Sequence, residues 1–273
     1  MQFLCKTRGL ETMRLPIYQV DAFTDSLFGG NPAAVCPLDA WLPDATMQAI
    51  AAENNLSETA FFVPQGGDYV LRWFTPTVEV DLCGHATLAS GHVVMSYIEP
   101  QREGVSFHTA KAGTLKVSRR AGMLVMDFPA WPATPCAAPP GLLAALGGTP
   151  REVLRARDYL IVYDSTAEIA ALAPDLAALA KVDCWAAIVT APGENGVDFV
   201  SRFFAPAQGV PEDPVTGSAH CTLVPYWAER LNKTELEARQ ISRRGGALRC
   251  ALNGDRVSLG GHAVVYLEGR IEV

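Results

Sequence analysis

The sequence predicts an α+β protein of two pseudo-symmetric lobes, each a curved mixed β-sheet or barrel wrapped around a central helix. An internal repeat, apolar strand patterns in both halves and a proline-rich stretch between the halves support this prediction. The repeat is Arg72-Trp-Phe-Thr-Pro76, which recurs 130 residues later as Arg202-Phe-Phe-Ala-Pro206. Eleven residues after each arginine, a turn of glycine and small residues opens an apolar segment. We expect these segments, 85–97 and 218–231, to form the central helices.

In the first half, the spacing of apolar residues predicts a helix between strands. Pro43 and Asp44 are typical of a helix start, and Met47, Ile50 and Ala51 follow the i, i+3, i+4 spacing of one helix face. The predicted elements are, in order, a strand over 17–23, this helix, strands over 59–63 and 69–74, the helix over 85–97 and a hairpin over 115–128.

The second half repeats this order of elements. They are a helix over 174–180, strands over 185–189 and 197–204, the helix over 218–231 and a hairpin over 247–259. Pro225 lies inside the second central helix. We expect it to kink or shorten that helix, because proline lacks an N–H group and its ring clashes with the preceding turn.

Composition along the chain predicts the domain boundaries. The Pro/Ala-rich stretch over 129–140 is the natural linker, so we expect an N-terminal lobe over 14–128 and a C-terminal lobe over 136–273. The last strand, over 263–273, could cross back and pack on the N-terminal lobe. Residues 1–13 are polar and unpatterned, which predicts a disordered tail or an upstream translation start.

Charge and composition disfavour several classes of function. The net charge of −7 argues against nucleic acid as a partner, because nucleic acid requires a basic patch. No segment reaches the roughly 18–20 uninterrupted apolar residues that cross a bilayer, so no membrane partner is predicted. The seven cysteines are spread along the chain and never form a Cys-x-x-Cys pair. This favours a reducing, cytoplasmic compartment over a disulfide framework.

Glu58 is the leading candidate for a catalytic group. It stands where a polar helix end meets the apolar strand over 59–63, and a carboxylate there is costly unless it is paired or used. It is either a capping or salt-bridged glutamate, or a general base in a cleft between the lobes. The matching stretch over 184–189 holds no carboxylate. Because the fold is duplicated and the candidate base is not, we predict one base acting on one substrate.

Two glycine turns could bind an anion. Gly84 with His85, and Gly217 with Ser218, lie where a loop becomes a central helix. The first N–H groups of a helix lack partners and carry partial positive charge, so the pair of turns could hold a substrate carboxylate. Alternatively, the glycines only permit tight turns and Ser218 caps its helix. His85 could contact the substrate or be structural, and Asp213 could orient a substrate group or begin an Asp-Pro turn.

No metal or organic cofactor is predicted. His85 and His92 are seven residues apart, His220 and Cys221 are adjacent, and neither spacing is that of a known metal site. The glycine motifs of dinucleotide sites and of phosphate-binding loops are absent from the sequence. We therefore expect activity without metal, nucleotide, flavin or pyridoxal phosphate.

Several ordered motifs resemble one known family. They are Val20-Asp-Ala-Phe-Thr24, Phe28-Gly-Gly-Asn-Pro-Ala-Ala-Val35, Asn55-Leu-Ser-Glu-Thr-Ala-Phe61, Phe74-Thr-Pro76, Cys83-Gly-His-Ala-Thr87 and Asp213-Pro-Val-Thr-Gly-Ser-Ala219. From Arg14 onward, the chain resembles the PhzF-like phenazine biosynthesis family, a branch of the diaminopimelate-epimerase-like fold. The resemblance implies a homodimeric isomerase that shifts a proton on a small carboxylate-bearing substrate, without metal or organic cofactor.

The resemblance also implies a set of site residues. By position, the family's acid/base glutamate falls on Glu58, and its substrate-contacting histidine and aspartate fall on His85 and Asp213. The substrate-binding residues that it implies are Ser57, Gly84, His85, Asp213, Gly217 and Ser218.

Two alternatives to this isomerase follow from the same residues. Related epimerases use two facing cysteines, one at the start of each glycine turn. Here Cys83 takes the first place, and the matching register puts Pro214 at the second, so a two-thiol racemase or epimerase lacks one thiol. The other alternative is a catalytically silent small-molecule binding protein, which the intact Glu58, His85 and Asp213 disfavour.

Overall fold

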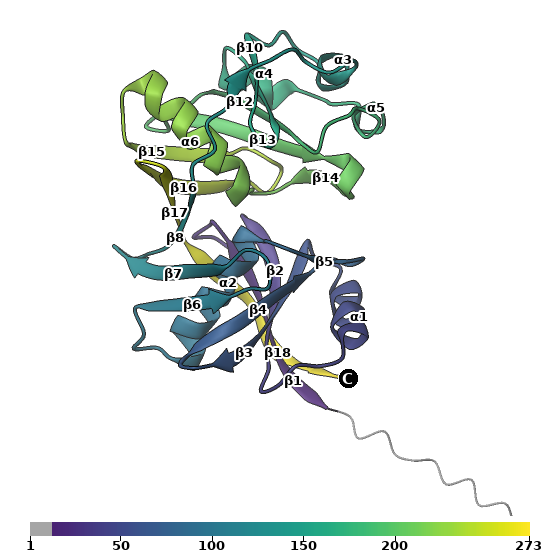
Figure 1. Ribbon diagram of the computed structural model, residues 1–273, viewed down its shortest axis with the longest axis vertical. Coiled ribbons are helices and arrows are strands. Elements are labelled where there is room, and N and C mark those ends of the chain that lie inside the picture. The colour runs from purple at the N-terminus through teal and green to yellow at the C-terminus, as the bar shows by residue number, and fades with distance from the viewer. Residues whose placement is uncertain (1–12) are drawn as a thin grey trace, which may run out of the picture.

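The computed structural model describes residues 13–273, which form two lobes stacked along the long axis of the molecule (Figure 1). One lobe contains helix α2 (Gly84–Val93), the other contains helix α6 (Gly217–Leu231), and strands surround each helix. The predicted α+β fold class is confirmed. Residues 1–12 of the predicted tail lie outside the described residues. Met13 exchanges two backbone hydrogen bonds with Val273.

The first lobe is built mainly from the N-terminal half of the chain. Its strands are β1 (Arg14–Ala22), β2 (Asn31–Pro37), β3 (Glu58–Gln65), β4 (Asp68–Phe74), β5 (Glu79–Val80), β6 (Gly104–His108), β7 (Thr114–Arg120) and β8 (Met123–Pro129). Helix α1 (Asp44–Asn54) and the short π-helix η1 (Val94–Ile98), which continues α2, complete it. As predicted, Met47, Ile50 and Ala51 are the buried residues of α1.

The second lobe follows the linker. Its strands are β9 (Thr134–Pro135), β10 (Glu152–Arg155), β11 (Tyr159–Val162), β12 (Ala187–Pro192), β13 (Phe199–Ala205), β14 (Val210–Asp213), β15 (Glu235–Gln240), β16 (Gly246–Asn253) and β17 (Arg256–Gly261). Its helical segments are α3 (Leu142–Leu146), α4 (Thr166–Ala171), α5 (Leu176–Leu179), η2 (Pro206–Gln208) and α6.

Two predicted helices of this lobe differ from the observed ones. The helix expected over 174–180 is the single turn α5, which begins at Leu176 because the Asp175 side chain accepts a hydrogen bond from the Ala178 N–H and caps the helix start. Helix α6 continues through Pro225 to Leu231, so the proline does not shorten it.

The repeated arginines make the same contacts in both lobes. Arg72 on β4 pairs with Glu79 on β5, and Arg202 on β13 pairs with Glu212 on β14, each with an Nε–O distance of 2.7 Å. Each guanidinium also lies over the ring of the phenylalanine two residues further along its strand. Strand pairing repeats as well, since β2 and β11 run parallel to β3 and β12, which pair antiparallel with β4 and β13. The internal repeat in the sequence is therefore a repeat of structure.

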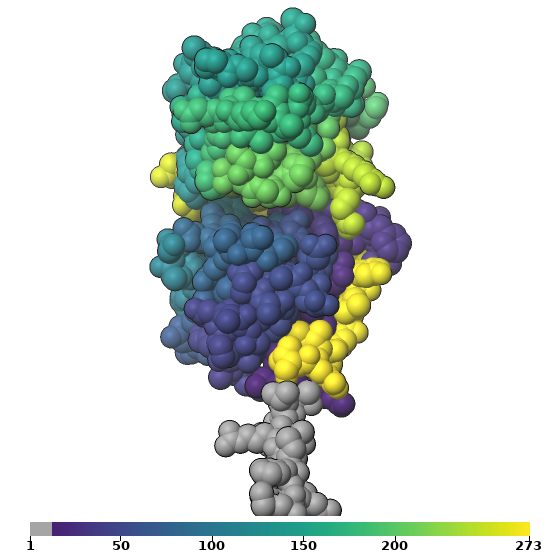
Figure 2. Space-filling model, turned by 90° about the vertical axis from the view of Figure 1, so that its right-hand side faces the viewer, coloured from purple at the N-terminus to yellow at the C-terminus, as the bar shows by residue number. Residues whose placement is uncertain are grey.

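Two strands from the end of the chain join the lobes. Strand β17 pairs antiparallel with β8, and β18 (Ala263–Glu272) pairs antiparallel with β1 along the first lobe. Figure 2 shows β18 as a yellow stripe on the surface of that lobe. The eighteen strands found in residues 13–273 form one hydrogen-bonded network. The lobes are therefore held together by strand pairing as well as by the linker.

The central helices lie within the main hydrophobic core. Residues of α2 are almost all buried, and its polar Thr87 and Ser90 donate to backbone carbonyls one turn earlier. Such a helix, buried on all sides, is typical of a protein core. Within the described part of the chain, no helix has the length and apolar character needed to cross a bilayer.

Candidate active site

The N-termini of the two central helices meet between the lobes. Gly84 opens α2 and Gly217 opens α6, and a Cβ atom on either glycine would lie 3.8 Å from the Cα atom of the other. The preceding residues, Cys83 and Thr216, make no side-chain cap with their helices. Two sets of first-turn N–H groups therefore point toward one place, which is suited to an anion such as a carboxylate.

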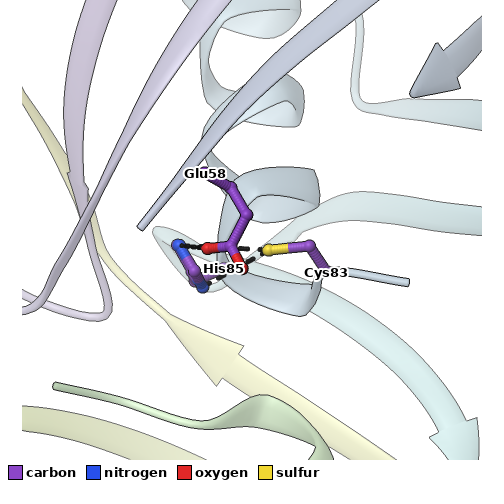
Figure 3. A group of neighbouring side chains, drawn as sticks. All are labelled: Glu58, Cys83 and His85. Carbon is purple, nitrogen blue, oxygen red and sulfur yellow. Dashed lines mark hydrogen bonds and ion pairs between the residues drawn. The ribbon is translucent and has the colours of Figure 1, made fainter. Parts of the chain in front are cut away.

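Glu58 lies beside the start of α2, where β3 begins. Its Oε2 atom is 3.1 Å from Nε2 of His85, and both side chains are largely removed from solvent (Figure 3). Apart from that contact, Oε2 accepts no hydrogen bond from the described residues. Burial alone would lower the pKa of His85, but Cys83 and Glu58 beside the ring raise it well above its ordinary value. His85 is thus suited to hold the Glu58 carboxylate in place.

Cys83 is the third member of this group. Its Sγ atom lies 3.5 Å from Nδ1 and 3.9 Å from Nε2 of His85. Burial, with a smaller contribution from the Glu58 charge, raises the pKa of the Cys83 thiol to about 11, so the thiol is neutral near pH 7. One ligand atom each from Glu58, Cys83 and His85 lies within 4.8 Å of the others. The pairs considered from spacing, His85 with His92 and His220 with Cys221, do not include this group.

Asn31 connects the two lobes at the site. It begins β2, is fully buried, and its Nδ2 donates to Asp213 Oδ1 (2.8 Å) and to the Val215 carbonyl (2.9 Å). The same Nδ2 lies 3.2 Å from Nδ1 of His85, and Oδ1 has no partner among the described residues. Sequence reasoning did not select Asn31 as a site residue. The sequence feature that could have identified it is its position in Gly29-Gly-Asn-Pro32. There a polar amide begins a buried strand and needs hydrogen-bond partners.

Asp213 is placed on the second-lobe side of this network. Its Oδ2 accepts from the Thr216 hydroxyl at 2.5 Å, and Gln240 donates to its carbonyl at 2.7 Å. Burial is the main cause that raises the pKa of Asp213 to about 6. The nearby Glu58 charge acts in the same direction, and His85 opposes it. Glu58 and His85 of the first lobe therefore influence the pKa of Asp213 in the second lobe.

The two serines are placed differently. Ser57 immediately precedes Glu58, half-buried in the bend before β3. Ser218 lies in the first turn of α6, where its Oγ accepts a hydrogen bond from Arg157 Nη2 at 3.2 Å. The guanidinium of Arg157 also pairs with the buried Asp158 and lies 5.1 Å from the centre of the Trp131 ring.

The structure corrects which residue of the second glycine turn corresponds to Cys83 in the comparison with two-thiol epimerases. Cys83 directly precedes Gly84, and the residue that directly precedes Gly217 is Thr216, not Pro214. The expected position was wrong because the match was made on the Thr-Gly pair and not on the helix start. Cys221 lies inside α6 with its Sγ near the Gly217 carbonyl. The residue before α6 that corresponds to Cys83 before α2 is therefore Thr216, which carries a hydroxyl and no thiol.

Comparisons with known proteins identify the family of the chain. The family model described as "Phenazine biosynthesis-like protein" matches residues 20–269. An uncharacterised isomerase of Pseudomonas aeruginosa is 56% identical over 261 residues, covering 96% of this chain and all of that protein. An uncharacterised isomerase of Halalkalibacterium halodurans is 48% identical over 264 residues, covering 95% and 99%.

Solved structures show the same fold. A PhzF family protein of Enterococcus faecalis superimposes with a TM-score of 0.93 at 46% identity, covering 96% of this chain and all of that one. A hydroxyproline epimerase of Agrobacterium vitis matches with a TM-score of 0.61 at 12% identity, over 97% and 93% of the chains. At that identity the second match concerns the fold alone.

Proposed function

Because the chain belongs to the phenazine biosynthesis-like (PhzF) family and is an isomerase, we propose that it shifts a proton on a small carboxylate-bearing substrate with Glu58 as the acid/base group. The observation that carries this proposal is the position of the Glu58 carboxylate, 3.1 Å from His85 and beside the two helix N-termini that meet at Gly84 and Gly217.

In this mechanism each group has one task. The first-turn N–H groups at Gly84, Gly217 and Ser218 hold the substrate carboxylate and stabilise the negative charge left when a neighbouring proton departs. Glu58 takes that proton and returns it elsewhere on the same molecule. His85 and Asp213 position the substrate, and Ser57 lies next to the base. None of these steps requires a metal or an organic cofactor.

The partners and location form part of the proposal. The substrate is a small carboxylic acid, nucleic acid and membranes are not partners, and the enzyme acts in the cytoplasm as a homodimer. The first lobe supports a dimer because β1 and β18 each carry a tyrosine that pairs with an aromatic ring from outside these strands. Tyr18 lies 4.9 Å from Tyr97, and Phe28 lies 5.7 Å from Tyr266, between ring centres. Phe28 and Tyr266 are 68% and 49% exposed, which is unusual for large apolar rings.

Analytical ultracentrifugation tests the dimer. We expect a single species of twice the chain mass, and a shift toward monomer when Tyr266→Arg places a charge beside the exposed Phe28 ring. A wild-type protein that sediments as a monomer at micromolar concentrations would contradict it.

Hydrogen exchange tests the chemistry without knowledge of the substrate. Purified protein is incubated in D₂O with a panel of small carboxylic acids, and mass spectrometry identifies an acid that acquires deuterium. The wild type should label at least one acid, and Glu58→Gln should not. An acid that binds tightly and never exchanges would favour the silent binding protein.

A further inference from the structure

The Glu58–Cys83–His85 group offers three different donor atoms to one point in space. Glu58 comes from the first residue of β3, and Cys83 and His85 come from the residue before α2 and from its first turn (Figure 3). Oε2 and Nε2 are 3.1 Å apart, Sγ and Nε2 are 3.9 Å apart, and all three atoms lie within 4.8 Å of one another.

These separations suit a single small ion. Zinc binds thiolate sulfur at about 2.3 Å, imidazole nitrogen at about 2.0–2.1 Å and carboxylate oxygen at about 2.0–2.2 Å, so neighbouring ligands of one tetrahedral zinc lie roughly 3.3–3.8 Å apart. The observed Oε2–Nε2 and Sγ–Nε2 separations fall on either side of that range. Binding of one ion by the three atoms therefore requires small movements of the Glu58 and Cys83 side chains.

The donor set selects a particular class of cation. Magnesium and calcium prefer sites made of oxygen alone, whereas a thiolate with an imidazole and a carboxylate is a donor set of zinc and the later first-row metals. Three protein ligands leave a fourth tetrahedral position for water or for a ligand carboxylate.

The surrounding structure restrains the group. Asn31 Nδ2 lies 3.2 Å from the second ring nitrogen of His85, so the ring keeps Nε2 turned toward Glu58. The Oε2 atom of Glu58 is buried and accepts no hydrogen bond from the described residues, so it is free to take another electrophile.

We propose that Glu58, Cys83 and His85 form an inhibitory binding site for a zinc-class divalent cation. On binding, the metal takes the sulfur, nitrogen and oxygen lone pairs, and the protons of the thiol and of Nε2 leave to water. The carboxylate of Glu58 is then no longer available as a base. The inhibitory part rests on the proposed function, but the binding part does not.

Cobalt replaces zinc in a spectroscopic binding test that needs no substrate. Addition of Co²⁺ to the metal-free full-length protein should produce a near-ultraviolet thiolate-to-cobalt charge-transfer band, and Zn²⁺ should remove it by competition. Cys83→Ala and Cys83→Ser should both lack the band. Cys184→Ala, which changes a partly exposed cysteine elsewhere, should keep it. Circular dichroism establishes that each variant is folded.

Isothermal titration calorimetry measures the affinity of the protein for Zn²⁺. Glu58→Gln should weaken binding by at least about tenfold, because loss of one group that tunes a metal site already costs about 10–100-fold. A wild type without the band, or a band that persists in both Cys83 variants, overturns the proposal. If the band forms as expected and Zn²⁺ leaves deuterium exchange unchanged, the cation site stands and the role of Glu58 as the base fails.

Discussion

Gly84 and Gly217 face each other across the boundary between the lobes, where a Cβ atom on one would lie 3.8 Å from the Cα atom of the other. That distance is an ordinary van der Waals contact, so the space between the two helices admits one methyl group without a clash. The first-turn N–H groups of both helices begin beside this contact. Small residues at these positions therefore serve the anion site more than the fold.

Alanine at Gly84 should separate binding from stability. We expect unchanged or slightly higher stability, since Gly→Ala in a helix gains about 0.4–1 kcal/mol. We expect the KM of the exchanged acid to rise about tenfold or more, because the methyl group lies beside the first-turn N–H groups that hold the carboxylate; tenfold corresponds to ~1.4 kcal/mol. Thermal unfolding and deuterium-exchange kinetics measure the two effects.

Gly91 in the same helix provides the control. A Cβ atom there would lie 2.7 Å from a methyl carbon of Val117. Gly91→Ala should therefore lower the melting temperature, in contrast to Gly84→Ala. A KM for Gly84→Ala equal to that of the wild type would contradict the carboxylate site between the helices.

Removal of the Asn31 amide should affect both stability and the pH profile. Asn31→Ala leaves Asp213 and the Val215 carbonyl short of a donor, and buried polar groups left without partners cost about 1–3 kcal/mol each. The Asn31 hydrogen bond lowers the pKa of Asp213, so its loss should move that pKa further upward and shift the acidic limb of the rate profile to higher pH. A rate profile that does not move would reduce Asn31 to a purely structural residue.

The sequence predicts the fold more completely than the site. The period of Met47, Ile50 and Ala51 identifies α1, and the recurrence of Arg72 at Arg202 identifies the duplication, because both signals depend on local order along the chain. The helix predicted over 174–180 begins later, at Leu176, because the side chain of Asp175 forms its N-cap, a contact that the prediction did not include.

The contacts of the site depend on how distant segments dock. Asn31 donates a hydrogen bond to Asp213, although the two residues are 182 positions apart in the sequence. A local sequence pattern cannot predict a contact between such distant residues. The proximity of Cys83 to Glu58 was missed for the same reason, since β3 and the start of α2 are brought together by the sheet around the helix. Motifs placed Glu58 and His85 in the candidate site, and the structure adds the 3.1 Å contact between them.

Asp213 should make stability depend on pH with a defined sign. Its pKa in the folded protein is raised from 3.8 to about 6, so between these values the folded state holds a proton that the unfolded chain has released. Stability from this group is therefore present below the unfolded value and is lost as pH rises through the folded value.

The isosteric Asp213→Asn variant removes this dependence. Relative to it, the wild type should lose free energy of unfolding between about pH 4 and about pH 7, as measured by urea denaturation at several pH values. A constant difference between the two proteins across that range would show that Asp213 does not titrate in this way.

Glu58→Gln is the decisive substitution for the proposed chemistry. Glutamine keeps the shape of the side chain and can still contact His85, but it cannot accept a proton, so deuterium exchange should fall by the roughly 10²–10⁴-fold typical of losing a general base. Substrate binding and the melting temperature should change little. Glu53→Gln provides a matched control, because Glu53 is exposed at the end of α1 and lies outside the site. If Cys83→Ala abolishes exchange and Glu58→Gln does not, a thiol and not the glutamate moves the proton.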